Sequence, residues 1–128
     1  HNEAYWDCRA WEAFGPGAAR FDGRNRTTNL RSVSVWIKKL LNNQSVTGDV
    51  DTMTAEGAAR ERLVLGLRRR CGVDRPAFFQ ASGFEVDDLA EKSIQEWVAA
   101  GFAEDDGRCI RLTRSGMLLS DSLWSAVL

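Results

Sequence analysis

The histidine and cysteine residues are the natural candidates for a metal site or a nucleophile in this sequence. The chain has one histidine, His1, and three widely spaced cysteines, Cys8, Cys71 and Cys109. A zinc or iron–sulfur site needs several such ligands at close spacing, and a Cys/His nucleophile pair needs a histidine that the fold can position. We therefore predict no metal-ligating and no catalytic residue. The cysteines are interpreted as free thiols or small apolar side chains.

Two pairs of adjacent carboxylates, Asp87/Asp88 and Asp105/Asp106, are the remaining candidates for acid–base chemistry. Adjacent residues of a helix point about 100° apart, and residues of a hairpin turn are solvated, so neither pair resembles a catalytic dyad. The sequence also lacks a P-loop, a G-x-S-x-G motif and an H-E-x-x-H motif. The residues by themselves indicate a non-catalytic accessory unit.

The overall composition is that of an ordinary globular protein with balanced charge. Of the 128 residues, 44% are hydrophobic, and 17 Lys and Arg face 18 Asp and Glu, for a formal net charge of -1. The chain is therefore not strongly basic, as proteins that bind nucleic acids or anionic membranes typically are. No apolar run approaches the roughly 18 residues of a membrane span. The odd number of cysteines favours a reducing compartment, and we expect a cytoplasmic protein. The start, with no initiator Met or signal peptide, indicates part of a longer protein.

The first part of the chain, residues 1 to about 31, shows no helical period. Residues 14–18, Phe-Gly-Pro-Gly-Ala, predict a tight, irregular turn whose small residues let another group approach the backbone, with a simple loop as the alternative. We expect residues 20–31 to be an exposed connection and residues 48–51 a surface linker. Between them, apolar residues recur at the spacing of one helix face: Val33, Trp36, Ile37, Leu40 and Leu41.

From about residue 53 the pattern becomes denser and more regular. Caps and apolar spacing predict helices over residues 54–70, 74–83 and 85–101. Asp106-Gly107 then predicts a hairpin over residues 102–112, and Thr113 caps a last helix. Gly66, inside the first of these helices, is expected to pack closely against another backbone. This order of elements is typical of a winged helix-turn-helix unit.

A winged helix often binds DNA, and the charge of its recognition helix decides whether that function fits. The expected recognition helix, residues 85–97, carries five acidic residues and a single lysine. Its negative charge would be repelled by the phosphates of DNA. Five arginines lie on a different helix and are interpreted as a solvated charged face: Arg60, Arg62, Arg68, Arg69 and Arg70. A winged-helix nucleic-acid-binding or protein-interaction module therefore stands only as the alternative function.

Several stretches, in chain order, resemble one protein family. The first are His1-Asn2, Tyr5-Trp6, residues 14–18 and Asn29, which are similar to the final barrel segment of the oxygen-independent coproporphyrinogen III oxidase-like proteins. These are radical S-adenosylmethionine (SAM) proteins, and the group includes related haem chaperones. The resemblance continues through residues 61–68, Gly72-Val73-Asp74, Gly101-Phe102, Leu112-Thr113 and Gly116. It covers nearly the whole chain.

The resemblance implies two cofactors in the full-length parent, a [4Fe-4S] cluster held by a C-x-x-x-C-x-x-C motif and SAM. None of the three cysteines here has that spacing, so we expect no cofactor in this chain itself. In the family the glycine–alanine turn lies beside SAM, which maps to Gly17, Ala18 and Ala19 as cofactor-binding residues in the parent only. A histidine commonly follows the glycine–alanine pair, and Ala19 stands there instead. A backbone contact survives that change, whereas a side-chain role does not.

The resemblance leaves the role of the parent open between two activities. In the oxidases, a radical generated from SAM decarboxylates propionate side chains of coproporphyrinogen III, whereas the chaperones carry haem. The compact C-terminal part is closer to the shorter, chaperone-like branch. Haem binding by this chain itself would depend on a few conventional axial ligands. These are His1, Tyr5, Cys8, Met53 and Met117.

The expected fold class is α+β and mostly helical. Residues 1–52 would be a partial segment of a radical SAM barrel with a linker and one helix, and residues 53–128 a winged-helix-like domain that covers the barrel. The expected partners are the remainder of that barrel and, in the parent, a porphyrinogen or haem. Exposed apolar surface, to which five tryptophans contribute, predicts a homodimer or a poorly soluble chain.

Overall fold

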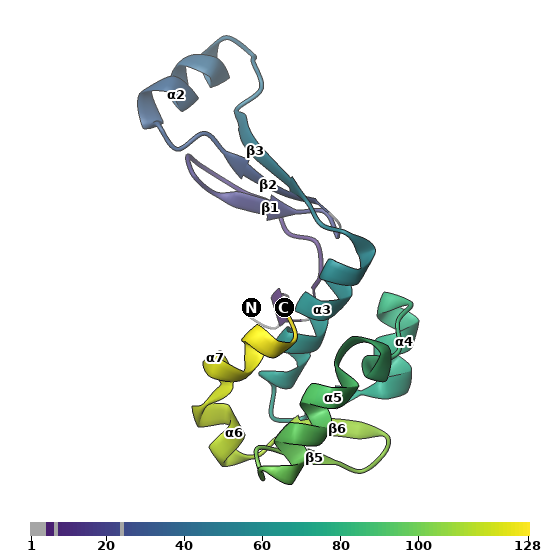
Figure 1. Cartoon of the computed structure of the whole chain (residues 1–128). Helices are drawn as coiled ribbons and strands as arrows, with labels where there is room; N and C mark the ends of the chain where they lie inside the picture. Colours follow the sequence, from purple (N-terminus) through teal and green to yellow (C-terminus); the bar gives the residue numbers. More distant parts are fainter. Residues whose placement is uncertain (1–4, 7, 24) are drawn as a thin grey trace. The chain divides into compact units, whose positions relative to one another are not determined.

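The chain forms two compact units, which we describe separately. The computed structural model describes residues 5, 6, 8–23 and 25–128 (Figure 1). The N-terminal unit comprises residues 1–54 and the C-terminal unit residues 55–128. Among the described residues, no helix combines the length and the apolar character that crossing a membrane would require.

The N-terminal unit is built on a three-stranded antiparallel sheet in the order β1-β2-β3. The strands are β1 (Ala19–Phe21), β2 (Asn25–Asn29) and β3 (Thr47–Thr52), with helix α2 (Val33–Leu41) between the second and the third. Thr27 pairs with Arg20 on one side and with Val50 on the other. The β1–β2 turn is set by Asp22, whose carboxylate accepts the backbone N–H of Asn25 at 2.7 Å.

The predicted exposed connection over residues 20–31 is wrong, because this segment contains the end of β1 and the whole of β2. Phe21 is only 5% exposed and Thr27 only 6%. The predicted linker over residues 48–51 is likewise wrong, since it lies within β3. The reason is physical: each of these strands buries at most one side chain, so no alternation of apolar and polar residues marks it in the sequence. Phe21 packs on Trp11, with 5.0 Å between ring centroids.

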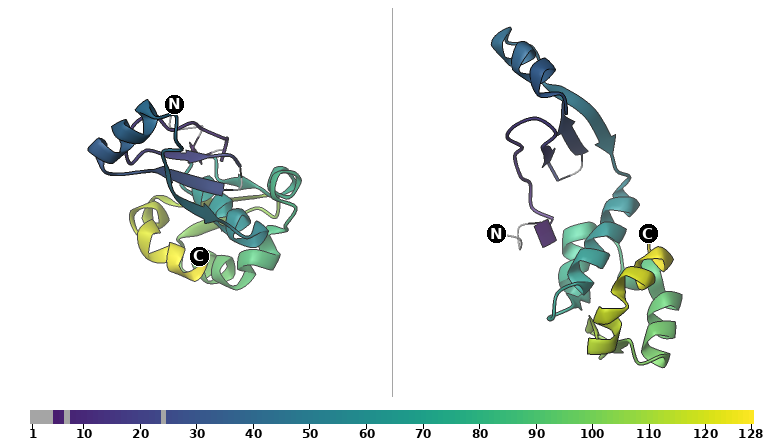
Figure 2. Two further views of the ribbon diagram at one scale, coloured as in Figure 1. Left: turned by 90° about the horizontal axis from the view of Figure 1, so that it is seen from above. Right: turned by 90° about the vertical axis from the view of Figure 1, so that its left-hand side faces the viewer.

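Helix α2 is confirmed at the position predicted, yet none of its residues is buried. It lies beyond the ends of β2 and β3 (Figures 1 and 2). Val33, Ile37 and Leu41 are exposed to 58%, 45% and 79%. An amphipathic helix gains its stability by covering its apolar face. Within the described part of the N-terminal unit, that face is uncovered.

The C-terminal unit combines helices with a second three-stranded antiparallel sheet, in the order β4-β6-β5. Its elements are α3 (Ala55–Leu67), β4 (Val73–Asp74), α4 (Arg75–Ser82), α5 (Val86–Ala99), β5 (Ala103–Asp105), β6 (Cys109–Leu112), α6 (Arg114–Leu118), α7 (Ser120–Leu123) and a final 3-10 turn, Trp124–Ala126. The predicted helices over residues 54–70, 74–83 and 85–101 and the predicted hairpin are confirmed to within about three residues. The single last helix predicted after Thr113 is wrong, because that segment is divided into α6, α7 and the 3-10 turn. The two-residue strand β4 was not predicted, because it is too short to produce a periodic pattern.

Capping residues fix the ends of the short helices. The Asp74 carboxylate accepts the Ala77 N–H at 3.0 Å at the start of α4, which ends at Gly83 with φ of 77°. At the start of α6, the Thr113 hydroxyl accepts the Gly116 N–H at 3.1 Å and donates to the Gly101 carbonyl at 2.8 Å. Thr113 therefore joins α6 to the segment that precedes the hairpin.

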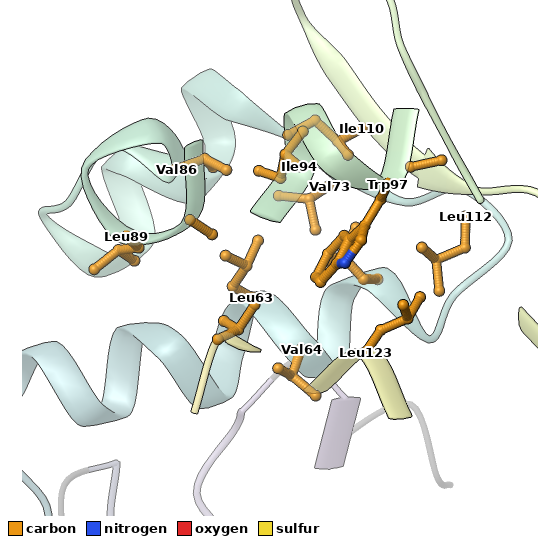
Figure 3. Packing of buried hydrophobic residues seen from close by; sticks show 14 of the residues in the cluster. Leu63, Val64, Val73, Val86, Leu89, Ile94, Trp97, Ile110, Leu112 and Leu123 are labelled. Carbon is orange, nitrogen blue, oxygen red and sulfur yellow. The ribbon is translucent and has the colours of Figure 1, made fainter. Parts of the chain in front are cut away.

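One hydrophobic core holds the C-terminal unit together. Its most deeply buried large side chains are Leu63, Leu67, Val86, Ile110 and Val127. Figure 3 shows residues of α3, α5 and β6 converging on this core. Burial of each such side chain stabilises the fold by roughly 1.5–3 kcal/mol. Within this core, Trp97 and Trp124 meet edge to face, with ring centroids 6.4 Å apart and an interplanar angle of 82°.

Gly66 packs against a side chain, so the predicted contact with another backbone is wrong at this position. A Cβ there would stand 2.6 Å from Cγ2 of Val73. The close backbone contacts belong to two other glycines. A Cβ at Gly72 would overlap the Ile110 carbonyl oxygen, and one at Gly116 the Phe102 carbonyl oxygen. These two glycines set how closely the hairpin approaches its neighbours.

Helix α5 is kinked at Ala90, where φ is -152° and ψ is 21°. The carbonyl of the preceding residue, Leu89, accepts a hydrogen bond from Nη1 of Arg60 at 2.8 Å. The same nitrogen donates to the Val127 carbonyl at 2.9 Å. A side chain that takes a carbonyl from the helix ladder is a known cause of such kinks. Arg60 thereby connects α3 to α5 and to the last residues of the chain.

Candidate functional site

The residues predicted to lie beside a cofactor form the end of a tight turn and the start of β1. Gly17 and Ala18 precede the strand and Ala19 begins it. Gly15 and Gly17 have φ of 95° and 70°, in the left-handed region that glycine adopts without strain. The predicted tight, irregular turn is therefore confirmed for residues 15–17.

Hydrogen bonds from neighbouring segments hold this turn in place. Gly17 N–H donates to the Leu30 carbonyl at 3.0 Å, and Asn29 N–H donates to the Ala18 carbonyl at 2.9 Å. The Asn29 side-chain amide donates to the Gly15 carbonyl at 2.9 Å. The fold thus brings Asn29 and the turn together, although they are more than ten residues apart in the sequence. A turn fixed in this way is preorganised for contact with a ligand.

Trp11 adds a contact that nothing in the sequence pattern indicated. Its indole Nε1 donates to the Ala19 carbonyl at 2.8 Å, and its ring also packs against Tyr5 with 4.8 Å between centroids. No periodicity or motif links Trp11 to Ala19, so sequence reasoning had no signal for this bond. It anchors the start of β1 from the side opposite β2.

The outer side of the turn is open to an approaching group. A Cβ at Gly15 would meet nothing within 4 Å, and one at Gly17 would touch only Arg31, at 3.7 Å. Gly17, Ala18 and Ala19 carry no polar side-chain atoms. The turn fits a ligand held by backbone groups and van der Waals contact, and it offers no side chain for proton transfer.

The cysteines do not fit an iron–sulfur cluster. Cys8 belongs to the N-terminal unit and Cys71 and Cys109 to the C-terminal unit, and no disulfide joins any two of them. Within residues 5, 6, 8–23 and 25–128, no three His, Cys, Asp or Glu side chains gather in a way that could hold a metal ion. His1, one of the candidate haem ligands, lies outside the described residues.

In the C-terminal unit, ionic contacts join the hairpin to α4 and α5. The Arg75 guanidinium lies 2.6 Å from Asp105 and 3.2 Å from Asp87. Arg108 lies 2.8 Å from Asp74, and its hydrogen bond, followed by that from the Ala77 N–H, lowers the pKa of the Asp74 carboxyl. These contacts join the elements to one another.

The aspartates of the two carboxylate pairs, Asp87/Asp88 and Asp105/Asp106, do not act together: the members of each pair have different surroundings. Asp105 binds Arg75, whereas its neighbour Asp106 accepts the N–H groups of Cys109 and Arg108 at 2.7 and 2.9 Å. These backbone bonds lower the pKa of the Asp106 carboxyl. Asp87 contacts Arg75, and Asp88 is an exposed residue of α5.

The arginines of α3 and its C-terminal end do not act as one solvated face. Arg60 is tied to two carbonyls, as described above, and also lies 2.8 Å from Glu56. The Arg68 guanidinium lies over the Trp124 ring, 5.7 Å from its centroid. Only part of this basic segment is thus available to other molecules.

Comparison with known proteins places the chain among relatives of about three times its length. The haem chaperone HemW of Bacillus subtilis is 28% identical over 128 residues, which are 100% of this chain and 34% of that protein. In structure, the chain matches coproporphyrinogen III oxidase (HemN) of Escherichia coli, a radical SAM enzyme, with a TM-score of 0.75 and 15% identity. This match covers 93% of the chain and 28% of HemN, and it shows the fold. Residues 53–119 match the HemN C-terminal domain family. The chain belongs to that family, as the C-terminal portion of a HemN/HemW-type protein.

Proposed function

We propose that this chain is the C-terminal portion of a radical SAM protein that acts in porphyrin synthesis or haem delivery, and that its C-terminal unit is an accessory domain that covers the barrel. One observation carries the proposal: the match to a haem chaperone runs through all 128 residues, while the chain spans about a third of that relative. The structural likeness to HemN over 93% of the chain supports it independently.

The proposed domain division is residues 1–52 as the last part of the barrel and residues 53–128 as the accessory domain. The family match begins at residue 53, and the division between compact units falls after residue 54. The uncovered apolar face of α2 supports a barrel that continues outside this chain, since such a face is stable when another part of the protein covers it.

The order of elements in the accessory domain supports a winged-helix arrangement. Helices α3, α4 and α5 precede a hairpin whose strand β6 pairs with β4 between the first two helices, and this hairpin would be the wing. Helix α5, at the position of a recognition helix, exposes Asp87, Asp88, Glu91 and Glu96. This acidic face opposes nucleic-acid binding, and the comparisons do not favour that alternative.

In the full-length parent, the turn at Gly17, Ala18 and Ala19 would contact SAM through backbone atoms. The open side of the turn and its fixed geometry support this role. SAM, when bound and reduced, supplies a radical. The iron–sulfur cluster that the family uses to reduce SAM would be held by cysteines outside this chain. Isolated from the rest of the barrel, the chain is expected to show no SAM binding in calorimetry, and micromolar affinity would contradict this proposal.

Between the two activities, haem delivery has the stronger support, because the relative that matches the whole chain is a haem chaperone. The decisive experiment uses the full-length protein with its cluster reconstituted. We expect it to bind haem and transfer it to a haem-free acceptor protein, and to leave coproporphyrinogen III unchanged. Decarboxylation of coproporphyrinogen III would assign the oxidase activity instead. If neither activity is found and no C-x-x-x-C-x-x-C motif precedes this chain, the proposal is wrong.

A further inference from the structure

A pocket opens on the surface of the C-terminal unit. Its volume is about 490 Å³, and it is lined by Arg70, Leu112, Arg114 and Met117. These residues come from the segment after α3, the end of β6 and the helix α6. Small-molecule sites commonly have volumes of roughly 300–1,000 Å³. The pocket is therefore large enough for a small organic ligand or for part of a larger one.

The pocket carries positive charge that no carboxylate neutralises. Arg70 and Arg114 are exposed, and among the described residues neither forms an ion pair. A second surface pocket of about 370 Å³ is also lined by two arginines, Arg75 and Arg108, but both already contact aspartates. Of these two pockets, the one at Arg70 and Arg114 is the better suited to an anion.

The same pocket has an apolar component. Leu112 is buried and Met117 is half-buried, and methionine adapts its flexible side chain to irregular or planar surfaces. The next two residues, Leu118 at the end of α6 and Leu119 just after it, are exposed to 80% and 48%. A ligand with an apolar body and carboxylate groups would use both components.

The backbone around the pocket is fixed. Besides the Thr113 side-chain bonds described above, Thr113 N–H donates to the Phe102 carbonyl at 2.9 Å. Gly116 packs against the same Phe102 residue so closely that no larger side chain fits. Arg114 and Met117 therefore project from a helix that is held firmly in place, which reduces the entropy lost when a ligand binds.

We propose that this pocket binds carboxylate side chains of an apolar ring system and, resting on the proposed function, the propionates of a porphyrin. An arginine guanidinium pairs with a carboxylate through two parallel hydrogen bonds, so two arginines match two propionates. Met117 of α6 and Leu112 of β6 would contact the edge of the ring. The site binds through charge and shape and does not need the porphyrin to contain iron.

The test uses metal-free protoporphyrin IX, which has two propionates, titrated into the full 128-residue chain and followed by its absorbance. The double variant R70Q/R114Q should raise Kd at least tenfold, and each single variant should raise it less. The control K92Q removes one positive charge from α5, outside the pocket, and should leave Kd unchanged. A porphyrin whose propionates are converted to neutral amides should bind at least tenfold more weakly to the unmodified chain.

A second measurement locates the bound porphyrin. The chain has two methionines, Met53 and Met117, so a sample labelled with ¹³C at the methionine methyl groups gives two NMR signals. The ring current of a bound porphyrin should shift the Met117 signal and leave the Met53 signal in place. The variant M53L assigns the two signals and leaves the pocket intact.

The proposal is overturned if R70Q/R114Q binds protoporphyrin IX as tightly as the unmodified chain, if the neutral amide binds equally well, or if the Met117 signal does not move. Both substituted arginines are exposed, so an unchanged unfolding temperature of the variants will show that the fold is intact. The proposed function would survive this failure, because it is tested in the full-length protein by haem transfer and coproporphyrinogen decarboxylation. Conversely, if the activity test fails while porphyrin binding is found, the proposed function is wrong but the proposed binding pocket is supported.

Discussion

At the scale of single residues, Cys109 shows how neighbouring groups alter the chemistry of a thiol. Its Sγ lies 3.7 Å from the Asp74 carboxylate. Burial is the main cause that raises the pKa of the Cys109 thiol, and the negative charge of Asp74 raises it further. The thiolate is the reactive form of cysteine, so this environment makes Cys109 a poor nucleophile.

Alkylation kinetics should reflect this difference between the cysteines. At mildly alkaline pH, iodoacetamide should modify the exposed Cys71 several-fold faster than Cys109, because Cys109 is half-buried and has a raised pKa. The variant D74N should accelerate the modification of Cys109 and leave the rate at Cys71 unchanged. Mass spectrometry of peptides over a time course measures both rates. Equal rates at the two cysteines of the unmodified chain would contradict the prediction.

Two glycines with the same backbone conformation should differ strongly in their tolerance of a methyl group. Gly72 and Gly83 have φ of 71° and 77°. A Cβ at Gly83 meets open space, so G83A should cost only about 1–2 kcal/mol of unfolding free energy for the left-handed conformation. At Gly72 the methyl group also overlaps the Ile110 carbonyl oxygen, and G72A should cost about 3 kcal/mol or more. Urea unfolding of the two variants measures the difference, and equal losses would be inconsistent with the packing described.

At the scale of elements, carboxylates secure the start of α4 and the turn of the β5–β6 hairpin. The pKa values of Asp74 and Asp106 are lowered from their ordinary value of 3.8. A group with a lowered folded-state pKa stabilises the fold above its unfolded-state pKa, and this contribution is lost as the pH falls through the folded value. Both elements should therefore loosen below about pH 4.

Acid unfolding should reveal the contribution of Asp74. D74N keeps a side chain that can cap α4 but removes the charge that binds Arg108. We expect D74N to be less stable than the unmodified chain at pH 7 and the difference to shrink as the pH falls from 4 to 2. The control is D88N, an exposed residue of α5. The unfolding temperature as a function of pH is the measurement, and a constant difference between D74N and the unmodified chain over this range would refute the assignment.

The elements also show how far the sequence predicts this fold. Helices α2 to α5 were predicted because each carries a run of apolar residues at helical spacing between recognisable caps, such as Asp74 and Gly83. The strands of the N-terminal unit were missed because Phe21 and Thr27 are their only buried positions. The candidate turn was found from Gly15, Pro16 and Gly17. The bonds that fix it come from Trp11 and Asn29, and such long-range partners leave no local pattern.

At the scale of the whole molecule, the C-terminal unit has a core of its own. Every residue of its buried cluster, from Ala59 to Val127, lies within residues 55–128. A segment with its own core can fold alone. We expect a fragment of residues 55–128 to give amide NMR signals that coincide with those of the same residues in the full chain. Collapsed or poorly dispersed signals from the fragment would show that the unit depends on residues 1–54.

The uncovered face of α2 predicts self-association of the isolated chain. Ile37 and Leu41 expose 45% and 79% of their surface, and pairing two such faces would remove apolar area from water. Light scattering should find a dimer or larger species, and I37E/L41E should shift it toward the monomer. V98E, which alters an exposed apolar residue of α5, is the matched control. A monomeric unmodified chain at high micromolar concentration would rule the prediction out.

The edge-to-face contact of Trp97 and Trp124 gives the C-terminal unit an intrinsic spectroscopic label. They are the only tryptophans in residues 55–128, and their rings are close enough for the electronic transitions of the two indoles to couple. Such coupling produces a paired circular dichroism signal that replacing either tryptophan with phenylalanine would abolish. The difference between the spectra of the unmodified chain and of either variant would therefore follow the unfolding of the C-terminal unit without an added fluorophore.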